Sequence, residues 1–237
     1  MKVHIIHLYP KEMNIYGDTG NRLVLSQRLK WRGYEPIVHL VGLGDKLPAE
    51  TDIILGGGGQ DSGQALVIDD LAKRQAELNA MADDGVTMLM ICGMYQLFGH
   101  YFLTQDGDKL PGISVFNLVT RGSNQRLIGN IVSETPFGQL VGYENHSGLT
   151  ELAKGLAALG KCPKGQGNNG ADQNEGATVQ NVFGSYLHGP ILSKNPHFAD
   201  ELITRTIERK SGQKVQLTPL SDELELAAAN VAKSRPR

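Results

Sequence analysis

The chain has few of the features that mark secreted, membrane or metal-binding proteins. Its 237 residues include only two cysteines, Cys92 and Cys162, whereas a small secreted domain held by disulfides would carry more. It has no Cys-x-x-Cys motif and no paired histidines at metal-ligand spacing, so we expect no metal site. No apolar run approaches the roughly 18–20 residues that span a membrane. The N-terminus predicts a strand and not a signal peptide, so we expect a cytoplasmic protein.

A surplus of one charge sign is also absent. The 23 basic and 25 acidic residues give a formal net charge of -2. This balance excludes the broad basic field that non-specific nucleic-acid binding uses, and we expect no nucleic-acid partner. The length allows one large domain or two small ones, with a substantial core in either case.

Apolar runs alternate with amphipathic segments through the first half of the chain. Strands are predicted at 3–8, 36–41, 52–55 and 86–91, and helices at 22–32 and 64–83. The run at 86–91 is almost continuously apolar, which is typical of a parallel strand that is covered on both faces. The alternation predicts a doubly wound α/β fold.

The second half is richer in predicted strands. They fall at 113–119, 126–132, 139–144 and 179–187, followed by a helix from Pro196 to about residue 210 with Asn195 as N-cap, and another helix at 224–232. The polar, glycine-rich segment 161–174 predicts an exposed loop. We expect one domain over residues 1–210 and a helical tail, 211–237, outside the catalytic core.

Cys92 stands where a predicted strand turns into a helix. The apolar run at 86–91 leads into it and Gly93 follows it. Such a turn raises a nucleophile above a sheet edge, and the helix N-terminus is expected to favour the thiolate. The amide of Gly93 is a candidate donor to the oxyanion of a tetrahedral intermediate. A lone cysteine is more often a small buried core residue, but the junction and the glycine favour a nucleophile.

A cysteine nucleophile needs a base, and seven histidines are available. His188 ends an apolar strand, and the carboxyl ends of parallel strands meet at one edge of an open α/β sheet. We therefore expect His188 to lie near Cys92 and to act as its base. His146, in the segment 143–146, is the competing candidate.

Four consecutive glycines, at 56–59, end another predicted strand. They lack the Gly-x-x-x-x-Gly-Lys-Ser/Thr pattern of a phosphate-binding loop and the Gly-x-Gly-x-x-Gly pattern of a dinucleotide site. A flexible turn is one interpretation. The other is that the glycine amides, with Gly57 and Gly58 foremost, complete an oxyanion hole beside Cys92.

The segment 91–99, Ile-Cys-Gly-Met-Tyr-Gln-Leu-Phe-Gly, resembles the nucleophile elbow of the class I glutamine amidotransferases, and more narrowly the Cys-Gly-x-Tyr-Gln elbow of the cobyric acid synthase branch. Segments 55–61, 142–146 and 184–190 resemble that branch's glycine-rich strand, substrate-side segment and histidine segment. The resemblance implies a flavodoxin-like three-layer α/β sandwich with a mostly parallel central sheet. It also implies substrate-binding roles for Gln96, Arg126, Asn145 and His146, although a solvated strand-end charge is an equal interpretation of Arg126.

Cobyric acid synthase carries an ATP-dependent ligase domain ahead of this one, and we expect no room for it here. The segments 145–146 and 188–192 are similar to the free-standing GatD subunits of lipid II isoglutaminyl synthase. This resemblance implies a heterodimer with a Mur-ligase-like MurT subunit, which holds ATP and Mg, and no cofactor in this chain. Glutamine would supply ammonia for the D-glutamate α-carboxylate of lipid II, in peptidoglycan synthesis at the inner face of the membrane.

One position departs from many class I enzymes, which place a glutamate two residues after the histidine to orient it. Here that residue is Pro190. Because histidine bases usually need an orienting partner, we expect a carboxylate from elsewhere in the chain or, as the family implies, from the ligase subunit. Alternative functions are a cysteine hydrolase of the same fold, an amidotransferase with another acceptor, and a non-catalytic scaffold, which intact Cys92, Gln96 and His188 disfavour.

Overall fold

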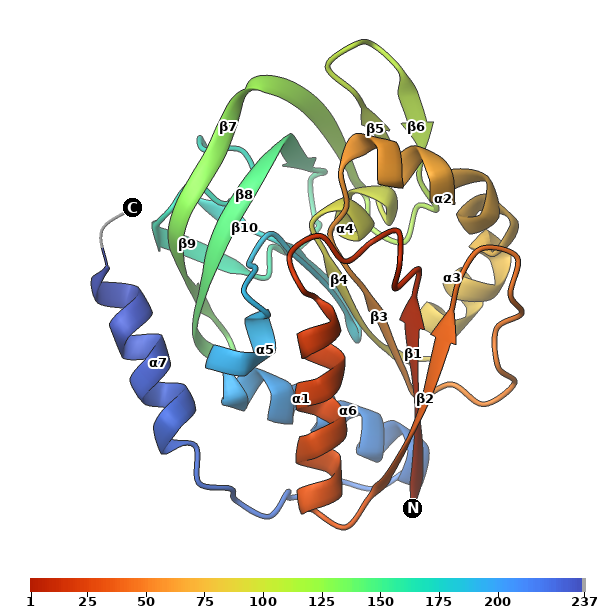
Figure 1. Cartoon of the computed structure of the whole chain (residues 1–237), viewed down its shortest axis with the longest axis vertical. Helices are drawn as coiled ribbons and strands as arrows, with labels where there is room; N and C mark the ends of the chain where they lie inside the picture. Colours follow the sequence, from red (N-terminus) through yellow and green to blue (C-terminus); the bar gives the residue numbers. More distant parts are fainter. Residues whose placement is uncertain (236–237) are drawn as a thin grey trace.

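The computed structural model describes residues 1–235, which form two six-stranded sheets and the helices around them (Figure 1). The first sheet has the order β11-β12-β4-β3-β1-β2, and its neighbours are parallel except for β11 and β12. Its strands are β1 (Lys2–Leu8), β2 (Glu35–Val41), β3 (Ile53–Gly56), β4 (Thr87–Ile91), β11 (Ala177–Val179) and β12 (Val182–Ser185). The prediction of a mostly parallel central sheet is confirmed.

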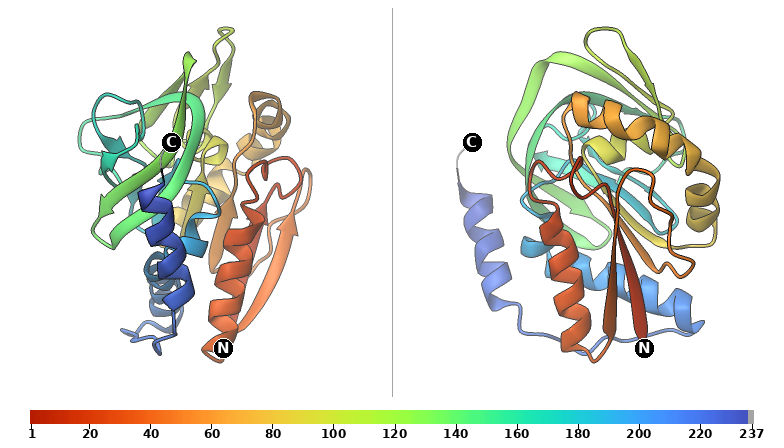
Figure 2. Two further views of the ribbon diagram at one scale, coloured as in Figure 1. Left: turned by 60° about the vertical axis from the view of Figure 1, so that its left-hand side comes forward. Right: turned by 45° about the vertical axis from the view of Figure 1, so that its right-hand side comes forward.

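Helices cover both faces of this sheet. On one side lie α1 (Thr19–Trp31) and α6 (Pro196–Ser211), and on the other α2 (Asp61–Lys73) and α3 (Gln75–Asp83) (Figures 1 and 2). Because both faces are covered, every residue of β3, β4 and β12 is buried. Two short helices, α4 (Gly93–Leu97) and α5 (Ile191–Lys194), begin just beyond the carboxyl ends of β4 and β12.

The second sheet stands beside the carboxyl ends of the parallel strands (Figure 1). It contains β5 (Tyr101–Leu103), β6 (Lys109–Pro111), β7 (Leu118–Thr135), β8 (Gly138–Leu152), β9 (Gly160–Lys164) and β10 (Asn174–Glu175). β7 and β8 form a long antiparallel hairpin whose register shifts between Gly122 and Leu127. The hairpin therefore supplies a wall at the edge of the first sheet where ligands bind in open α/β folds.

The last helix, α7 (Glu223–Ser234), lies outside this hairpin and contacts β7, β8 and α5 (Figure 2). Arg28 of α1 bonds to Asp200 of α6 at 2.7 Å and to Asp222, just before α7, at 2.6 Å. The division of the chain at residue 210 stays a prediction, and residues 236–237 of the predicted tail lie outside the described part. Over residues 1–235, no helix is long and apolar enough to cross a membrane.

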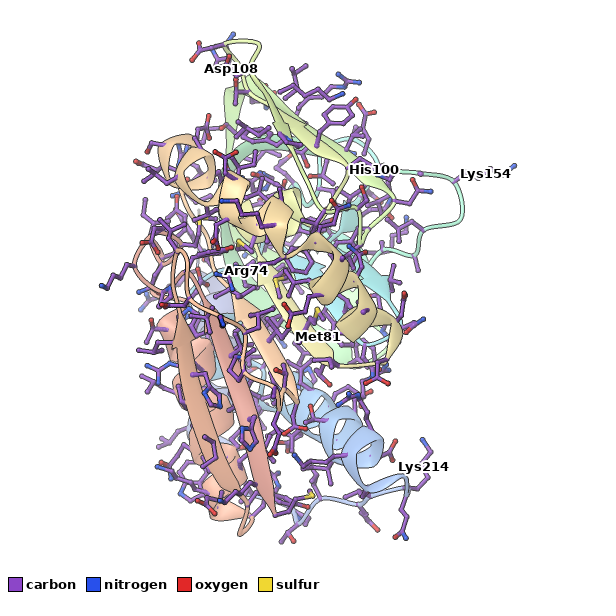
Figure 3. All side chains as sticks on the ribbon, turned by 90° about the vertical axis from the view of Figure 1, so that its right-hand side faces the viewer. Arg74, Met81, His100, Asp108, Lys154 and Lys214 are labelled. Atoms are coloured by element: carbon purple, nitrogen blue, oxygen red, sulfur yellow. The ribbon has the colours of Figure 1, made fainter. Side chains whose placement is uncertain are left out.

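Three predicted elements differ from the structure. The strand expected at 179–187 is divided by a turn at Gln180 and Asn181 into β11 and β12, which pair with each other. The helix expected at 64–83 is two helices that meet at Arg74, whose guanidinium is held by Asp70 at 2.6 Å and by the carbonyl of Gly42 at 3.1 Å (Figure 3). The strand expected at 113–119 begins only at Leu118. Before it, the backbone amide of Ile113 donates to the carbonyl of Leu97 at the end of α4, so this segment completes a helix and does not pair as a strand.

The segment 161–174 is not the exposed loop that its polar composition predicts. It begins as β9, and the side chain of Asn168 is fully buried. The backbone amides of Gln166 and Gly167 donate to the buried carboxylate of Glu144 at 2.9 Å each. Polar backbone can be buried when it has such an acceptor, and the acceptor comes from another strand of the sheet.

Candidate active site

Cys92 occupies a strained turn between β4 and α4. Its φ of 51° and ψ of −106° lie in a region that non-glycine residues rarely adopt. The turn is fixed because the Cys92 amide donates to the Ser185 carbonyl of β12 at 2.8 Å. Glycine at position 93 permits a close approach, since a Cβ there would lie 2.8 Å from Cε of Met13 and 3.1 Å from the amide nitrogen of Gly59. The predicted nucleophile elbow is present in the structure.

A cavity of about 370 Å³ opens above the cysteine. The start of α2, the turn after β1 and the β7–β8 hairpin form its walls. Among its lining residues are Tyr16, Gly59, Asp61, Cys92, Gln96, Arg126, Asn145 and His146. The structure thus brings together residues more than 120 positions apart in the sequence, between Tyr16 and His146.

His188 is the histidine that lies beside the nucleophile. A Cβ on Gly58 would be 3.1 Å from Cε1 of His188 and 3.3 Å from Cβ of Cys92, so the two side chains are neighbours across this glycine. The backbone of His188 exchanges two hydrogen bonds with Tyr143 of β8, at 2.8 and 3.1 Å. Neither nitrogen of its buried ring has a hydrogen-bond partner among residues 1–235. The described chain therefore supplies the base without a carboxylate to orient it.

His146, the competing candidate, is held as part of the cavity wall. Its Nδ1 lies 2.8 Å from the carbonyl of Gly148, and its ring stacks on Tyr186 with centroids 3.6 Å apart. These contacts fix the ring at the hairpin, and Nε2 has no hydrogen-bond partner within the described residues 1–235. His146 is therefore placed to contact a substrate, whereas His188 is the neighbour of Cys92 across Gly58.

The expectation of a thiolate at rest is wrong for the chain alone. Burial and the nearby charge of Asp18 raise the pKa of the Cys92 thiol to about 12. Burial and the neighbouring His146 lower the pKa of His188 to about 3. The helix that follows, α4, has only five residues, so its dipole is small. Near neutral pH the pair is therefore an uncharged thiol beside an uncharged imidazole.

The glycine run contributes to the site differently from the prediction. The Gly58 amide donates to the Asp18 carboxylate at 2.7 Å, which engages it away from an oxyanion. Gly57 packs against Asp18 and the carbonyl of Met13, and it does not line the cavity. Gly59 does line it and lies beside Gly93. The amides that can donate to an oxyanion are therefore those of Gly59 and Gly93, and not those of Gly57 and Gly58 as predicted.

The predicted substrate residues divide into two groups. Gln96 forms the cavity floor, because its side-chain oxygen accepts from Gln64 at 2.7 Å and its nitrogen donates to the Tyr186 hydroxyl at 3.0 Å. Arg126 lies at the exposed rim, where Nε donates to Oδ1 of Asn145 at 2.6 Å. Its Nη2 donates to the Tyr16 hydroxyl at 3.1 Å. Arg126 and Asn145 thus remain candidates to bind substrate.

Sequence reasoning missed Tyr16 and Asp18. The ring of Tyr16 lies 4.1 Å from that of His188 by centroids, and its hydroxyl donates to the Asn145 carbonyl at 3.2 Å. Asp18 is buried, and burial raises the pKa of its carboxyl to about 6. Both belong to the turn after β1, whose place at the carboxyl end of a parallel strand was an available signal.

Glu175 supports the end of β12, three residues before His188, and it is expected to make stability depend on pH. Its Oε1 accepts from Ser185 at 3.0 Å and from the Tyr186 amide at 2.7 Å. Burial raises the pKa of this carboxyl from 4.5 to about 8, so in that interval the folded chain holds a proton that the unfolded chain has released. The free energy of unfolding should therefore fall as pH rises from about 4.5 to about 8.

Urea unfolding of the wild type and of Glu175→Gln across this interval measures the effect. Glutamine does not titrate but retains an oxygen that can accept both hydrogen bonds. The variant should lose less stability than the wild type as the pH rises. Parallel curves for the two proteins would contradict a protonated Glu175 in the folded chain.

Sequence comparison with known proteins assigns the chain to a family. Residues 4–196 match the CobB/CobQ-like glutamine amidotransferase domain. The chain is 40% identical over 228 residues to the GatD subunit of lipid II isoglutaminyl synthase from Streptococcus pneumoniae, which covers 94% of this chain and 87% of that one. It is 38% identical over 229 residues to the same subunit from Staphylococcus aureus, which covers 96% and 93%.

The fold agrees with this relationship. A crystal structure of a glutamine amidotransferase superposes with a TM-score of 0.60 at 14% identity, over 85% of this chain and 98% of that chain. The resemblance drawn from the elbow and histidine segments is confirmed over nearly the whole length. The chain therefore belongs to the CobB/CobQ-like glutamine amidotransferase family and, within it, to the GatD subunits of lipid II isoglutaminyl synthase.

Proposed function

We propose that this chain is the glutaminase subunit of a lipid II isoglutaminyl synthase, and that it passes ammonia to a MurT-type ligase subunit. The observation that carries the proposal is the juxtaposition of Cys92 and His188 beneath a polar cavity. ATP and Mg belong to the partner, which activates the D-glutamate α-carboxylate of lipid II, and this chain needs no cofactor. The reaction takes place in the cytoplasm, at the inner face of the membrane.

The first half of the reaction forms a thioester. The Cys92 thiol gives its proton to His188 as the sulfur attacks the side-chain amide carbon of glutamine. The amides of Gly59 and Gly93 donate to the oxygen of the tetrahedral intermediate. His188 then returns the proton to the amide nitrogen, the carbon–nitrogen bond breaks, and ammonia leaves.

The second half releases glutamate. His188 removes a proton from water, which attacks the thioester carbonyl, and the same two amides hold the second oxyanion. The carbon–sulfur bond breaks and the proton returns to the sulfur. Ammonia reaches the ligase subunit before it equilibrates with solvent.

The pKa values of Cys92 and His188 indicate that the ligase subunit helps to activate the nucleophile. Transfer of a proton from a thiol of pKa about 12 to an imidazole of pKa about 3 is strongly unfavourable in the chain alone. A carboxylate beside the free His188 nitrogen would favour the imidazolium and so ease the transfer. Pro190 occupies the position where many class I enzymes carry that carboxylate. The partner subunit is therefore expected to donate it, which makes hydrolysis depend on assembly.

Labelling with the glutamine analogue 6-diazo-5-oxo-L-norleucine tests the glutaminase site. The diazoketone alkylates a cysteine that is activated inside a glutamine pocket, and mass spectrometry locates the label. We expect Cys92 to be labelled in the assembled complex, faster than in the isolated chain, and excess glutamine to prevent it. His188→Ala should abolish labelling, since the thiol then has no base.

Cys162 is an internal control for this experiment. It is also buried, and burial raises the pKa of its thiol, but it lies in β9 away from the cavity. It should stay unmodified throughout. Label on Cys162 in place of Cys92, or no label on the assembled complex, would overturn the proposed function.

A further inference from the structure

The cavity above Cys92 has two formally charged side chains on its rim, one of each sign. Asp61 is the first residue of α2, and Arg126 comes from β7 on the facing hairpin. Both side chains are exposed, whereas Cys92 at the base of the cavity is 5% exposed. Within residues 1–235 neither forms an ion pair, with the other or with any other residue.

The two charges have opposite effects on the nucleophile. Arg126 lowers the pKa of the Cys92 thiol and Asp61 raises it. An anion that stabilises the thiol works against a reaction in which the sulfur must lose its proton. Asp61 therefore does not help to activate the Cys92 thiol. Asp61 is the acidic residue in the first turn of α2, and the N-cap of that helix is Gln60.

Free glutamine has the charges that complement this rim. Its reacting amide stands at one end of the molecule, and its α-ammonium and α-carboxylate are at the other. With the amide at the sulfur, both charged groups point toward the opening of the cavity. Two rim residues of opposite sign can then bind both groups by charge-assisted hydrogen bonds.

We infer that Asp61 binds the α-ammonium group of L-glutamine while Arg126 binds its α-carboxylate, so that the pair selects a free α-amino acid. The inference rests on the proposed glutaminase function and assigns the amino-group half of its substrate site. A glutamine residue within a peptide lacks the free ammonium and carboxylate, and the same rim excludes it. Because Arg126 is already positioned by Tyr16 and Asn145, the cation side of the rim is preformed.

Asp61→Asn tests the assignment in the assembled complex, with Asp69→Asn as the matched control. Asp69 is exposed on the same helix and does not line the cavity, so its variant removes one charge and leaves the rim intact. The readouts are KM and kcat for L-glutamine and the competitive inhibition constant of glutaramate, which is glutamine without its amino group. Thermal unfolding of each variant checks that the fold is unchanged.

Asp61→Asn should raise KM for glutamine about 10- to 100-fold, the effect of losing one charged hydrogen bond, with little change in kcat. The inhibition constant of glutaramate should be the same as in the wild type, because this ligand has no ammonium to lose. Asp69→Asn should match the wild type for both ligands. Equal weakening of both ligands, or an unchanged KM for glutamine, would overturn the inference. A wild-type complex that hydrolyses no glutamine would instead refute the proposed function.

Discussion

Cys92→Ala is expected to abolish glutamine-dependent amidation of lipid II while ammonia-dependent amidation persists. Removal of a catalytic nucleophile costs at least about 10⁴-fold in rate when no other group can form the covalent intermediate. Alanine retains Cβ at the same positive φ, so the strain of the elbow does not change with the sulfur. The ligase subunit does not need the thiol if ammonia is supplied in solution. The measurement is the mass of the lipid II product, with ATP and either glutamine or an ammonium salt.

Cys162→Ala is the comparison for this variant. It removes the other buried thiol of the chain, outside the cavity, and should retain amidation with either nitrogen source. Size-exclusion chromatography establishes that both variants assemble with the ligase subunit. If an assembled Cys92→Ala complex used glutamine at the wild-type rate, Cys92 would not be the nucleophile.

Arg28→Ala is expected to lower the free energy of unfolding more than Glu175→Gln or Lys214→Ala. The Arg28 side chain is 3% exposed, and its guanidinium bonds two carboxylates, of Asp200 and Asp222, that are 26% and 20% exposed. Alanine leaves Asp222 without its cation, while Asp200 keeps its 2.6 Å ion pair with Arg32. Breaking a buried ion pair lowers the free energy of unfolding by about 3–5 kcal/mol. Because the two acids are partly exposed, we expect a loss of about 3 kcal/mol here. Urea unfolding monitored by circular dichroism measures it.

Lys214→Ala is the control, because it measures the loss of stability when a surface ion pair is removed. Lys214 bonds Glu208 at 2.9 Å, but its side chain is 94% exposed and reaches into solvent (Figure 3). A surface pair of this kind contributes less than about 1 kcal/mol. Comparable losses for the two variants would mean that the Arg28 network is worth no more than a surface ion pair. Because Asp222 precedes α7, we also expect that helix to unfold before the rest of the Arg28 variant.

The parts of the fold that were predictable are those set by local sequence pattern. Continuous apolar runs such as 86–91 identified the buried parallel strands, and the end of each strand located the cavity edge. That rule predicted that His188 lies near Cys92, with His146 as the competing base. The family resemblance then supplied the reaction, which spacing could not.

The remaining features depend on contacts between distant segments. The amide of Gly58 is engaged by Asp18, 40 positions away, and no local pattern reports such a contact. The polar segment 161–174 is partly buried because Glu144 supplies the acceptor for its amides. Likewise, the high pKa of the Cys92 thiol follows from the depth of its burial, which the elbow sequence does not reveal.

The two backbone hydrogen bonds between His188 and Tyr143 fix the main chain of the catalytic base. They attach the main chain of the base to β8, the strand that also carries Asn145 and His146. This bridge holds the main chain of His188 within the irregular segment after β12, and rotation about the two side-chain torsions remains. A carboxylate brought beside this ring by the ligase subunit would then act on the charge and rotamer of one side chain, with no rearrangement of the wall that receives glutamine.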